Sequence, residues 1–179
     1  MKRRMKLGVV FAVLSLAALV HVGTLWALPY LVTQRVVDRI LERTGSQPNA
    51  LWVAAPREAG ADLVPMENPD TVTASAWLDL AEGPLVLEMR APPEALLSSL
   101  AIYEYNTDTA FWATDLPTAR VVILRADAPL PEGSFTHVVQ LRGRHGFLLV
   151  RAILRDRYDA AQLERVVSSL RTATLRPLR

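Results

Sequence analysis

Thr71-Val-Thr-Ala-Ser-Ala-Trp-Leu-Asp-Leu80 alternates apolar and polar side chains more regularly than the rest of the sequence. Its even positions are all apolar, and its odd positions are polar apart from Trp77. Successive side chains of a β-strand point to opposite faces, so this alternation is typical of a strand with one buried face. The sequence therefore predicts a β-sheet whose inner face covers a core.

Strand-like segments continue downstream of this stretch. The turn at 82–84 contains Gly83 and Pro84, and it predicts that residues 85–90 return as the hairpin partner of 71–80. Further strands are predicted at 97–105, 111–114, 120–125, 136–142 and 147–154. Gly143-Arg-His-Gly146 predicts a short turn between the last two as antiparallel neighbours.

The end of the chain has a helical pattern. Asp159 and Gln162 form a capping box, and the predicted buried stripe comprises Leu163, Val166, Val167 and Leu170. No helical pattern falls between the strands, so an antiparallel sheet or sandwich is favoured over β-α-β repeats. The predicted fold class is α+β and mainly β, with a C-terminal helix packed on the sheet.

The N-terminal region predicts one membrane-spanning helix. From Leu7 to Val32 there are 26 residues without a charge, and the 22 from Leu7 to Leu28 precede the first proline. At about 1.5 Å per residue those 22 residues span roughly 33 Å, close to a hydrocarbon core of about 30 Å. Trp26 and Tyr30 are predicted interfacial anchors, and Pro29 is the predicted end of the helix.

The charges around this segment predict its orientation. Residues 1–6 hold four basic residues and no acidic one, which predicts a cytoplasmic N-terminus and places the rest of the chain in the periplasm of a bacterial inner membrane. The alternative is a cleaved signal peptide, since Ser15-Leu-Ala17 resembles a cleavage site. The apolar run continues fifteen residues past that point, which favours an uncut anchor.

Residues 33–44 predict a separate amphipathic helix, which Gly45 and Pro48 end. Its apolar stripe comprises Val36, Val37, Ile40 and Leu41. The stripe could pack on its own domain, lie on the bilayer surface or dock a partner, and we expect the first, which is the commonest outcome. The predicted organisation is thus a membrane anchor at 1–32 with a basic flank at 1–6, a juxtamembrane helix and linker at 33–48, and a β-rich periplasmic domain at 49–179.

The net charge of +2 divides into blocks of opposite sign. Residues 33–141 hold seven basic and fifteen acidic residues, whereas residues 142–179 hold nine basic and three acidic residues. We expect these two blocks to attract each other. The C-terminal arginines lack aromatic interleaving and any recognised motif, so we expect no nucleic-acid partner.

The sequence offers few catalytic patterns. It contains no cysteine, which excludes disulfides, thiolate metal sites and thiol nucleophiles. It also lacks the nucleophile elbow, the phosphate loop and the dinucleotide-binding glycines. We expect His137 on a strand and His145 in an exposed turn, and we expect no metal site and no cofactor.

Polar residues around the predicted strands form a candidate ligand site. Asn68-Pro-Asp-Thr71 is a turn by its own chemistry, which could serve only to start the strand. The functional alternative brings it together with Glu67 and Tyr105 at one end of the sheet, where carboxylates and tyrosines would line a pocket. The candidate ligand-binding residues are Asn68, Asp70, Thr71, Tyr103, Asn106 and Asp108.

Three segments resemble a known family. Asn68-Pro-Asp-Thr-Val-Thr-Ala-Ser-Ala-Trp-Leu-Asp-Leu80, Gly83-Pro-Leu-Val-Leu-Glu88 and Tyr103-Glu-Tyr-Asn-Thr-Asp108 together resemble the bacterial domain of unknown function 1254. The chain departs from the family pattern at Pro69, where an arginine is common. The resemblance implies that larger members fuse this domain to the domain of unknown function 1214, and that this chain is a short, anchored member.

These observations lead to two functional hypotheses. The first is a non-enzymatic envelope protein, anchored in the lipid bilayer, whose β-rich domain binds a companion protein carrying the domain of unknown function 1214. The acidic and basic blocks would give that companion charged surfaces to recognise. The alternative is an enzyme or small-ligand binder with its site at the Asn68 and Asp70 end of the sheet.

Overall fold

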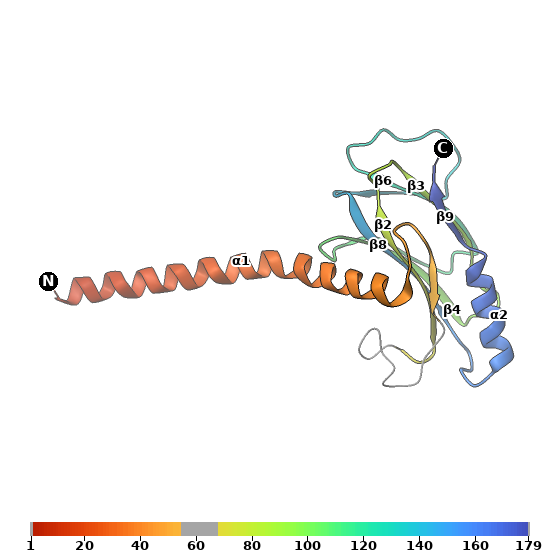
Figure 1. Ribbon diagram of the computed structural model, residues 1–179, viewed down its shortest axis with the longest axis horizontal. Helices are drawn as coiled ribbons and strands as arrows, with labels where there is room; N and C mark the ends of the chain where they lie inside the picture. Colours follow the sequence, from red (N-terminus) through yellow and green to blue (C-terminus); the bar gives the residue numbers. More distant parts are fainter. Residues whose placement is uncertain (1, 55–67, 179) are drawn as a thin grey trace.

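The computed structural model describes residues 2–54 and 68–178. Within these ranges the chain forms two α-helices and nine β-strands. Figure 1 shows a long helix, α1, projecting from a β domain that carries the second helix, α2, on its far side. The mainly β fold with a C-terminal helix is confirmed.

Helix α1 runs without a break from Lys2 to Thr44 and contains Pro29. The predicted end at Pro29 and the separate helix at 33–44 are therefore wrong. A proline removes one backbone hydrogen bond, but membrane-spanning helices tolerate it, and the turns after Pro29 gain contacts with the β domain. Gly45, at a φ of 64°, donates its N–H to the Leu41 carbonyl at 2.9 Å and ends the helix as predicted.

The strands form two sheets. The first, sheet A, is antiparallel in the order β1-β2-β8-β4-β5, with β1 at Trp52–Ala54, β2 at Thr71–Asp79, β8 at His145–Ile153, β4 at Leu97–Glu104 and β5 at Thr109–Thr114. The second, sheet B, has the order β7-β6-β3-β9, with β7 at His137–Leu141, β6 at Thr118–Arg125, β3 at Leu85–Arg90 and β9 at Thr174–Pro177. In sheet B only the β6–β7 pair is parallel among the described strands.

Two predicted strand pairings are wrong. β2 pairs with β1 and β8 in sheet A, whereas β3 pairs with β6 and β9 in sheet B, so 71–80 and 85–90 form no hairpin. The turn at 143–146 likewise leads from β7 in one sheet to β8 in the other. Alternation identifies the buried face of a strand, but two strands that cover the same core from opposite sheets have the same pattern.

Both sheets contribute to one core. Val72, Leu78 and Leu148 come from sheet A, and Leu87 and Ile123 come from sheet B, and none of these side chains is accessible to solvent. Helix α2, at Ala160–Arg171, adds Val166 and Leu170. Asp159 caps it by accepting a hydrogen bond from the Gln162 N–H at 2.9 Å, as the capping box predicts.

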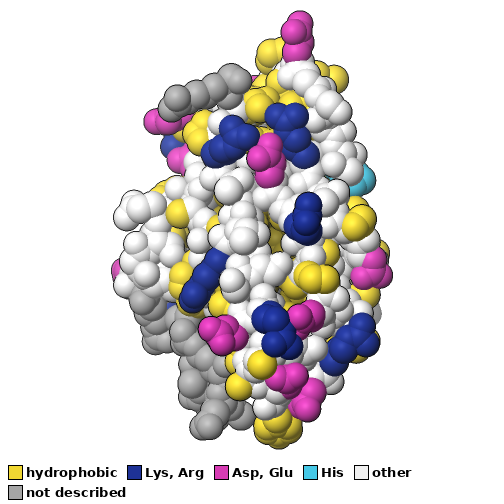
Figure 2. All heavy atoms as spheres, turned by 90° about the vertical axis from the view of Figure 1, so that its right-hand side faces the viewer, with side chains coloured by type: hydrophobic (Ala, Val, Ile, Leu, Met, Phe, Trp, Pro, Cys, Tyr) yellow, Lys and Arg dark blue, Asp and Glu magenta, His cyan; other side chains and the backbone are white. Residues whose placement is uncertain are grey.

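The attraction between the two charge blocks is confirmed. Five arginines of the C-terminal block form ion pairs with acidic residues of the preceding block: Arg142, Arg144, Arg157, Arg165 and Arg176. Figure 2 shows the face turned away from the N-terminal end of α1, where basic and acidic side chains are interspersed. Because these charges are paired within the chain, they give less support to a charge-recognising partner than the sequence indicated.

The shared core predicts the effect of shortening a buried side chain. We expect Leu148→Ala, at a residue with 0% exposure, to lower the free energy of unfolding by about 2–5 kcal/mol. Leu130→Ala, at a residue with 65% exposure, should change it by no more than about 0.5 kcal/mol. Urea unfolding of the full chain in detergent measures both, and equal losses would contradict a core shared by the two sheets.

Candidate functional site

Asn68, Asp70 and Thr71 lie where β2 begins. The Asn68 Oδ1 accepts a hydrogen bond from the Asp70 backbone N–H at 2.9 Å, as expected for the predicted turn. Thr71 is buried and pairs with Ile153 of β8. The Asp70 carboxylate lies 3.9 Å from the Arg157 Nε. These are the contacts of a turn that starts a strand.

Tyr103, Asn106 and Asp108 lie at the opposite end of sheet A. Tyr103 pairs with Phe147, six residues before Ile153 along β8, so the two candidate groups are about 20 Å apart. The structure therefore does not bring the six candidate residues into one site, and their role in ligand binding stays a prediction. Glu67 lies outside the described residues.

Asn106 and Asp108 belong to the turn between β4 and β5. The Asn106 Nδ2 donates to the Asp108 Oδ2 at 3.0 Å, and Arg142 donates to the same oxygen at 2.5 Å. The hydrogen bond from Asn106, followed by that from Arg142, lowers the pKa of Asp108 below its usual value. Arg142 also donates its backbone N–H to the buried Glu104 at 2.8 Å. One arginine thus ties this turn to the turn between β7 and β8.

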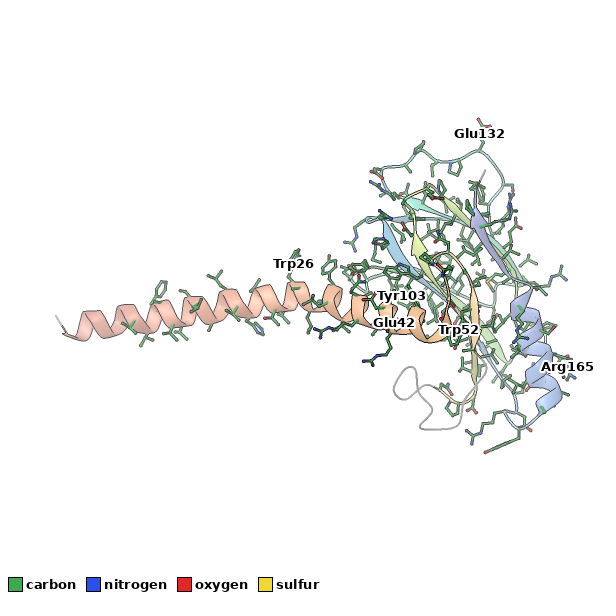
Figure 3. All side chains as sticks on the ribbon, in the orientation of Figure 1. Trp26, Glu42, Trp52, Tyr103, Glu132 and Arg165 are labelled. Atoms are coloured by element: carbon green, nitrogen blue, oxygen red, sulfur yellow. The ribbon has the colours of Figure 1, made fainter. Side chains whose placement is uncertain are left out.

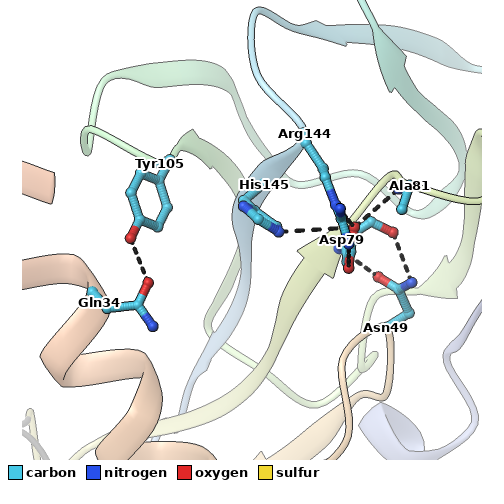
Figure 4. A network of polar contacts seen from close by, with 7 residues as sticks. All are labelled: Gln34, Asn49, Asp79, Ala81, Tyr105, Arg144 and His145. Atoms are coloured by element: carbon cyan, nitrogen blue, oxygen red, sulfur yellow. Dashed lines mark hydrogen bonds and ion pairs between the residues drawn. The ribbon is translucent and has the colours of Figure 1, made fainter.

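The polar network that the structure does form is centred on Asp79, the last residue of β2 (Figure 4). The Arg144 Nε and a terminal guanidinium nitrogen donate to its two carboxylate oxygens, each at 2.7 Å. The hydrogen bond from Arg144, which outweighs the opposing effect of burial, lowers the pKa of Asp79 to about 2. Asp79 is therefore a permanently charged partner of Arg144 near neutral pH.

Asn49 connects the segment after α1 to the same residue. Its Nδ2 donates to the Asp79 carbonyl at 2.9 Å, and its Oδ1 accepts from the Asp79 N–H at 2.8 Å. The Asn49 backbone N–H donates to the Trp77 carbonyl at 2.8 Å. Asn49 has a φ of 63°, a conformation that asparagine adopts more readily than most residues. The side-chain amide of Asn49 thus makes the two hydrogen bonds to the Asp79 backbone that a residue of a neighbouring strand would make.

An aromatic cluster lies next to this network. The His145 ring stacks on Trp77 with centroids 5.4 Å apart, and Tyr105 lies 5.6 Å from Trp77 and 5.9 Å from His145. His145 is the first residue of β8, so its predicted place in an exposed turn is wrong, whereas His137 lies on β7 as expected. The His145 Nε2 is 3.9 Å from the Asp79 carboxylate, too far for a hydrogen bond.

Tyr105 links the cluster to α1. Its hydroxyl donates to the Gln34 Oε1 at 2.5 Å, and its ring lies 5.6 Å from that of Tyr30. Burial, with a smaller effect from the charge of Asp38, raises the pKa of the Tyr105 hydroxyl. The hydroxyl therefore stays protonated and able to donate to Gln34.

The last turns of α1 pack on the outer face of sheet A, between the Tyr105–Gln34 contact and the Asn49–Asp79 contact. Val37 is only 5% exposed, and Ile40 and Leu41 are half-buried beside it. With Trp52 and Phe147 they border a cavity of about 20 Å³, near the minimum space for one water molecule. The expectation that this stripe packs on its own domain holds for these three residues, while Val36 is 46% exposed.

The term helix junction is used below for residues 34–49 of α1 and its linker together with five residues of the β domain. Trp77, Asp79 and His145 belong to strands of sheet A, and Tyr105 and Arg144 belong to the turns that follow β4 and β7. Alternation could not indicate Asp79, because it is one of several polar residues at odd positions of β2. Asn49 and Gln34 carry no local signal of long-range contacts either.

Comparison with known proteins supports the resemblance seen in the sequence. Residues 48–174 match the family model described as Protein of unknown function (DUF1254). The chain belongs to the DUF1254 family. No curated protein matches its sequence.

Two solved structures are similar to this DUF1254 chain. The crystal structure of the VPA0106 protein from Vibrio parahaemolyticus has a TM-score of 0.65 at 14% identity, and the match covers 86% of this chain and 37% of that one. A putative uncharacterized protein from Burkholderia cenocepacia has a TM-score of 0.45 at 16% identity, over 77% of this chain and 49% of that one. The first shows that the fold recurs, and this chain spans little more than a third of that longer protein.

The lowered pKa of Asp79 predicts how the free energy of unfolding depends on pH. A carboxyl whose folded pKa is depressed from 3.8 to about 2 stabilises the fold above pH 4, and this contribution is lost as the pH falls toward 2. We expect Asp79→Asn to lower the free energy of unfolding by about 1.5–3 kcal/mol at pH 7, the usual value of charged hydrogen bonds. The deficit should fall by about half at pH 3.

Asp127→Asn is the matched control, because Asp127 pairs with Arg125 at the surface and is 66% exposed. Its effect should stay within about 0.5 kcal/mol at both pH values. Urea unfolding at pH 7 and pH 3 measures the difference. A deficit of Asp79→Asn that is the same at both pH values would show that the ion pair with Arg144 does not stabilise the fold.

Proposed function

We propose that this DUF1254 chain is a single-pass membrane-anchored envelope protein whose β sandwich binds a companion polypeptide. Helix α1 is the one described helix long and apolar enough to cross a membrane. The basic residues before it favour a cytoplasmic N-terminus and a periplasmic sandwich. The companion proposed here is a DUF1214 polypeptide, the second domain that the family resemblance implies.

The relation to VPA0106 supports a companion. The fold of this chain occupies 37% of that protein, so the same sandwich occurs there with a large amount of additional chain. Where that additional chain packs on the matched fold in VPA0106, the equivalent surface of this sandwich would be available to a companion polypeptide. The ligand-site alternative gains no such support, because its residues lie at opposite ends of sheet A.

The proposed binding surface is the side of the sandwich where the edge strands β5 and β7 lie next to each other. Sheet A ends at β5 and sheet B ends at β7, and Phe111 of β5 lies 4.9 Å from His137 of β7, ring to ring. Unpaired edge strands present free backbone N–H and C=O groups to another chain. Trp112 on β5 is 63% exposed and Val138 on β7 is 48% exposed. This exposed tryptophan, beside two edges that pair with no further strand among the described residues, is the observation that supports the proposal most directly.

The two helices cover other parts of the sandwich. Helix α2 lies against β1, β2 and β3, at the opposite side from β5 and β7. The C-terminal half of α1 covers β2 and β8 on the outer face of sheet A. A partner at either of these places would have to displace a helix, whereas a partner at the β5 and β7 edges would not.

The test mixes the full chain in detergent with a purified DUF1214 polypeptide from the same genome and measures the dissociation constant by calorimetry. We expect Trp112→Ala to weaken binding at least about tenfold, because buried tryptophans dominate interface energies. Tyr158→Ala is the matched control, since Tyr158 is 79% exposed in the loop before α2. It should change the constant less than about twofold.

Two outcomes would contradict this proposal. One is the absence of any complex with the wild-type chain at micromolar concentration. The other is an equal effect of the two substitutions, which would place the contact away from β5. Unfolding curves of both variants should match the wild type, because the side chains they remove are exposed.

A further inference from the structure

The apolar part of α1 overlaps with the turns that contact the sandwich. Tyr30 and Gln34 contact Tyr105, and Val37 is buried on sheet A. The same turns carry solvent-facing apolar side chains: Leu28 at 50%, Leu31 at 58%, Val32 at 49% and Val36 at 46% exposure. One face of these turns is thus covered by protein, while another presents aliphatic side chains with no protein contact of comparable extent.

The length of the uncharged segment shows what surrounds these turns when α1 spans a bilayer. Between Lys6 and Arg35 lie 28 residues without a charge. At about 1.5 Å per residue they extend roughly 42 Å, which equals the 40–45 Å thickness of a bilayer with its headgroup layers. Tyr30 and Gln34 are the last turn of this segment, so they lie in the outer headgroup layer.

Tyr105 is held at that level by its contacts with both residues. Figure 1 shows the turn between β4 and β5 reaching back beside α1 toward the helix's N-terminal part. Trp26, labelled in Figure 3, is 73% exposed, and its ring lies 5.7 Å from that of Tyr30. Trp26, Tyr30 and Tyr105 therefore form a continuous line of rings from the helix to the sandwich.

The chemistry of this line fits a lipid surface. Tryptophan and tyrosine concentrate at the headgroup level, because their rings are apolar and their polar atoms need hydrogen bonds. The two arginines of the sandwich beside this line are balanced, since Arg142 is paired with Asp108 and Arg144 with Asp79. The contact therefore relies on aromatic and aliphatic side chains and requires no anionic lipid.

We propose that the sandwich rests directly on the bilayer, with the Tyr30–Tyr105 contact and the β4–β5 turn at 105–108 in the headgroup layer. This inference uses the membrane anchoring of the proposed function and is independent of the companion. The lipid surface is the partner of the helix junction, and the domain is not held away from it on a flexible linker. The continuity of α1 through residue 44 supports this, because the spanning segment and the docking segment are one helix.

The absence of cysteine from the sequence gives a direct test. Thr107→Cys places a bimane label in the exposed β4–β5 turn, and Glu132→Cys places one in the exposed loop before β7. Figure 3 shows Glu132 farther than Tyr103 from the N-terminal part of α1 along the direction of the helix. Both full-length proteins are inserted into phosphatidylcholine vesicles that carry a nitroxide on the lipid headgroup.

We expect quenching at position 107 to exceed quenching at position 132 at least threefold. Adding anionic phosphatidylglycerol should change the quenching at 107 less than twofold. A Tyr105→Ser substitution in the Thr107→Cys protein should reduce quenching at 107, because it removes the ring and the hydroxyl that hold the turn to α1. Tyr158→Ser in the same protein is the control and should leave it unchanged.

Equal quenching at both positions would overturn the inference, as would quenching at 107 that requires anionic lipid. Flotation of the vesicles is measured on the same samples. If the protein floats with the vesicles but both labels are quenched equally, α1 is anchored and the sandwich does not rest on the bilayer. If the protein does not float with the vesicles, the anchoring of α1 and the contact of the sandwich with the bilayer are both rejected. Binding of the DUF1214 companion is measured in detergent, so its failure is a separate result.

Discussion

The packing of α1 against the outer face of sheet A is the contact on which the architecture depends. Val37, Ile40 and Leu41 need an apolar surface, and β2 and β8 provide it with Trp77 and Phe147. This requirement explains the one exception in the alternation of β2. Trp77 occupies an odd position because that face of the strand is also covered, by the helix junction, at this end. β2 is consequently buried on one face and at least half-buried on the other.

Polar contacts set the position of the helix on that surface. Tyr105 holds Gln34 at one side of the apolar contact, and Asn49 holds Asp79 at the other. The two contacts lie fifteen residues apart in sequence, at the two ends of the docked segment. Apolar packing alone would allow the helix to slide, whereas paired hydrogen bonds at both ends specify one register. A helix fixed in this way has a defined orientation relative to the sandwich.

Much of this fold follows from local sequence. The alternation in 71–80 predicts β2, and the spacing of Gly83, Pro84 and the later apolar runs predicts six further strands that the structure contains. β1 and β9 are missed because they have only three and four residues. The strand pairings are missed for another reason: a periodic pattern says which face is buried, and the choice of neighbour depends on packing between distant segments.

The candidate site shows the same limit. The Asn68 turn has a local chemical signal, and the structure forms that turn. Asp79 has no such signal, because its importance comes from Arg144 and Asn49, which are 65 and 30 residues away in sequence. The predicted end of α1 at Pro29 fails similarly, since contacts with Tyr105 stabilise the turn that follows the proline. Local rules describe the chain until a distant contact outweighs them.

The pairing of the carboxylates also bears on the kind of function this chain can have. Acid–base catalysis needs a group whose pKa lies near the working pH. At the helix junction the contacts act in the opposite direction, since Arg144 lowers the pKa of Asp79 to about 2. The pKa of Asp108 is also lowered, by Asn106 and Arg142. These carboxylates are already occupied by their own chain and serve to hold strands, turns and helix together. Asp79 and Asp108 are therefore poorly suited to proton transfer near neutral pH.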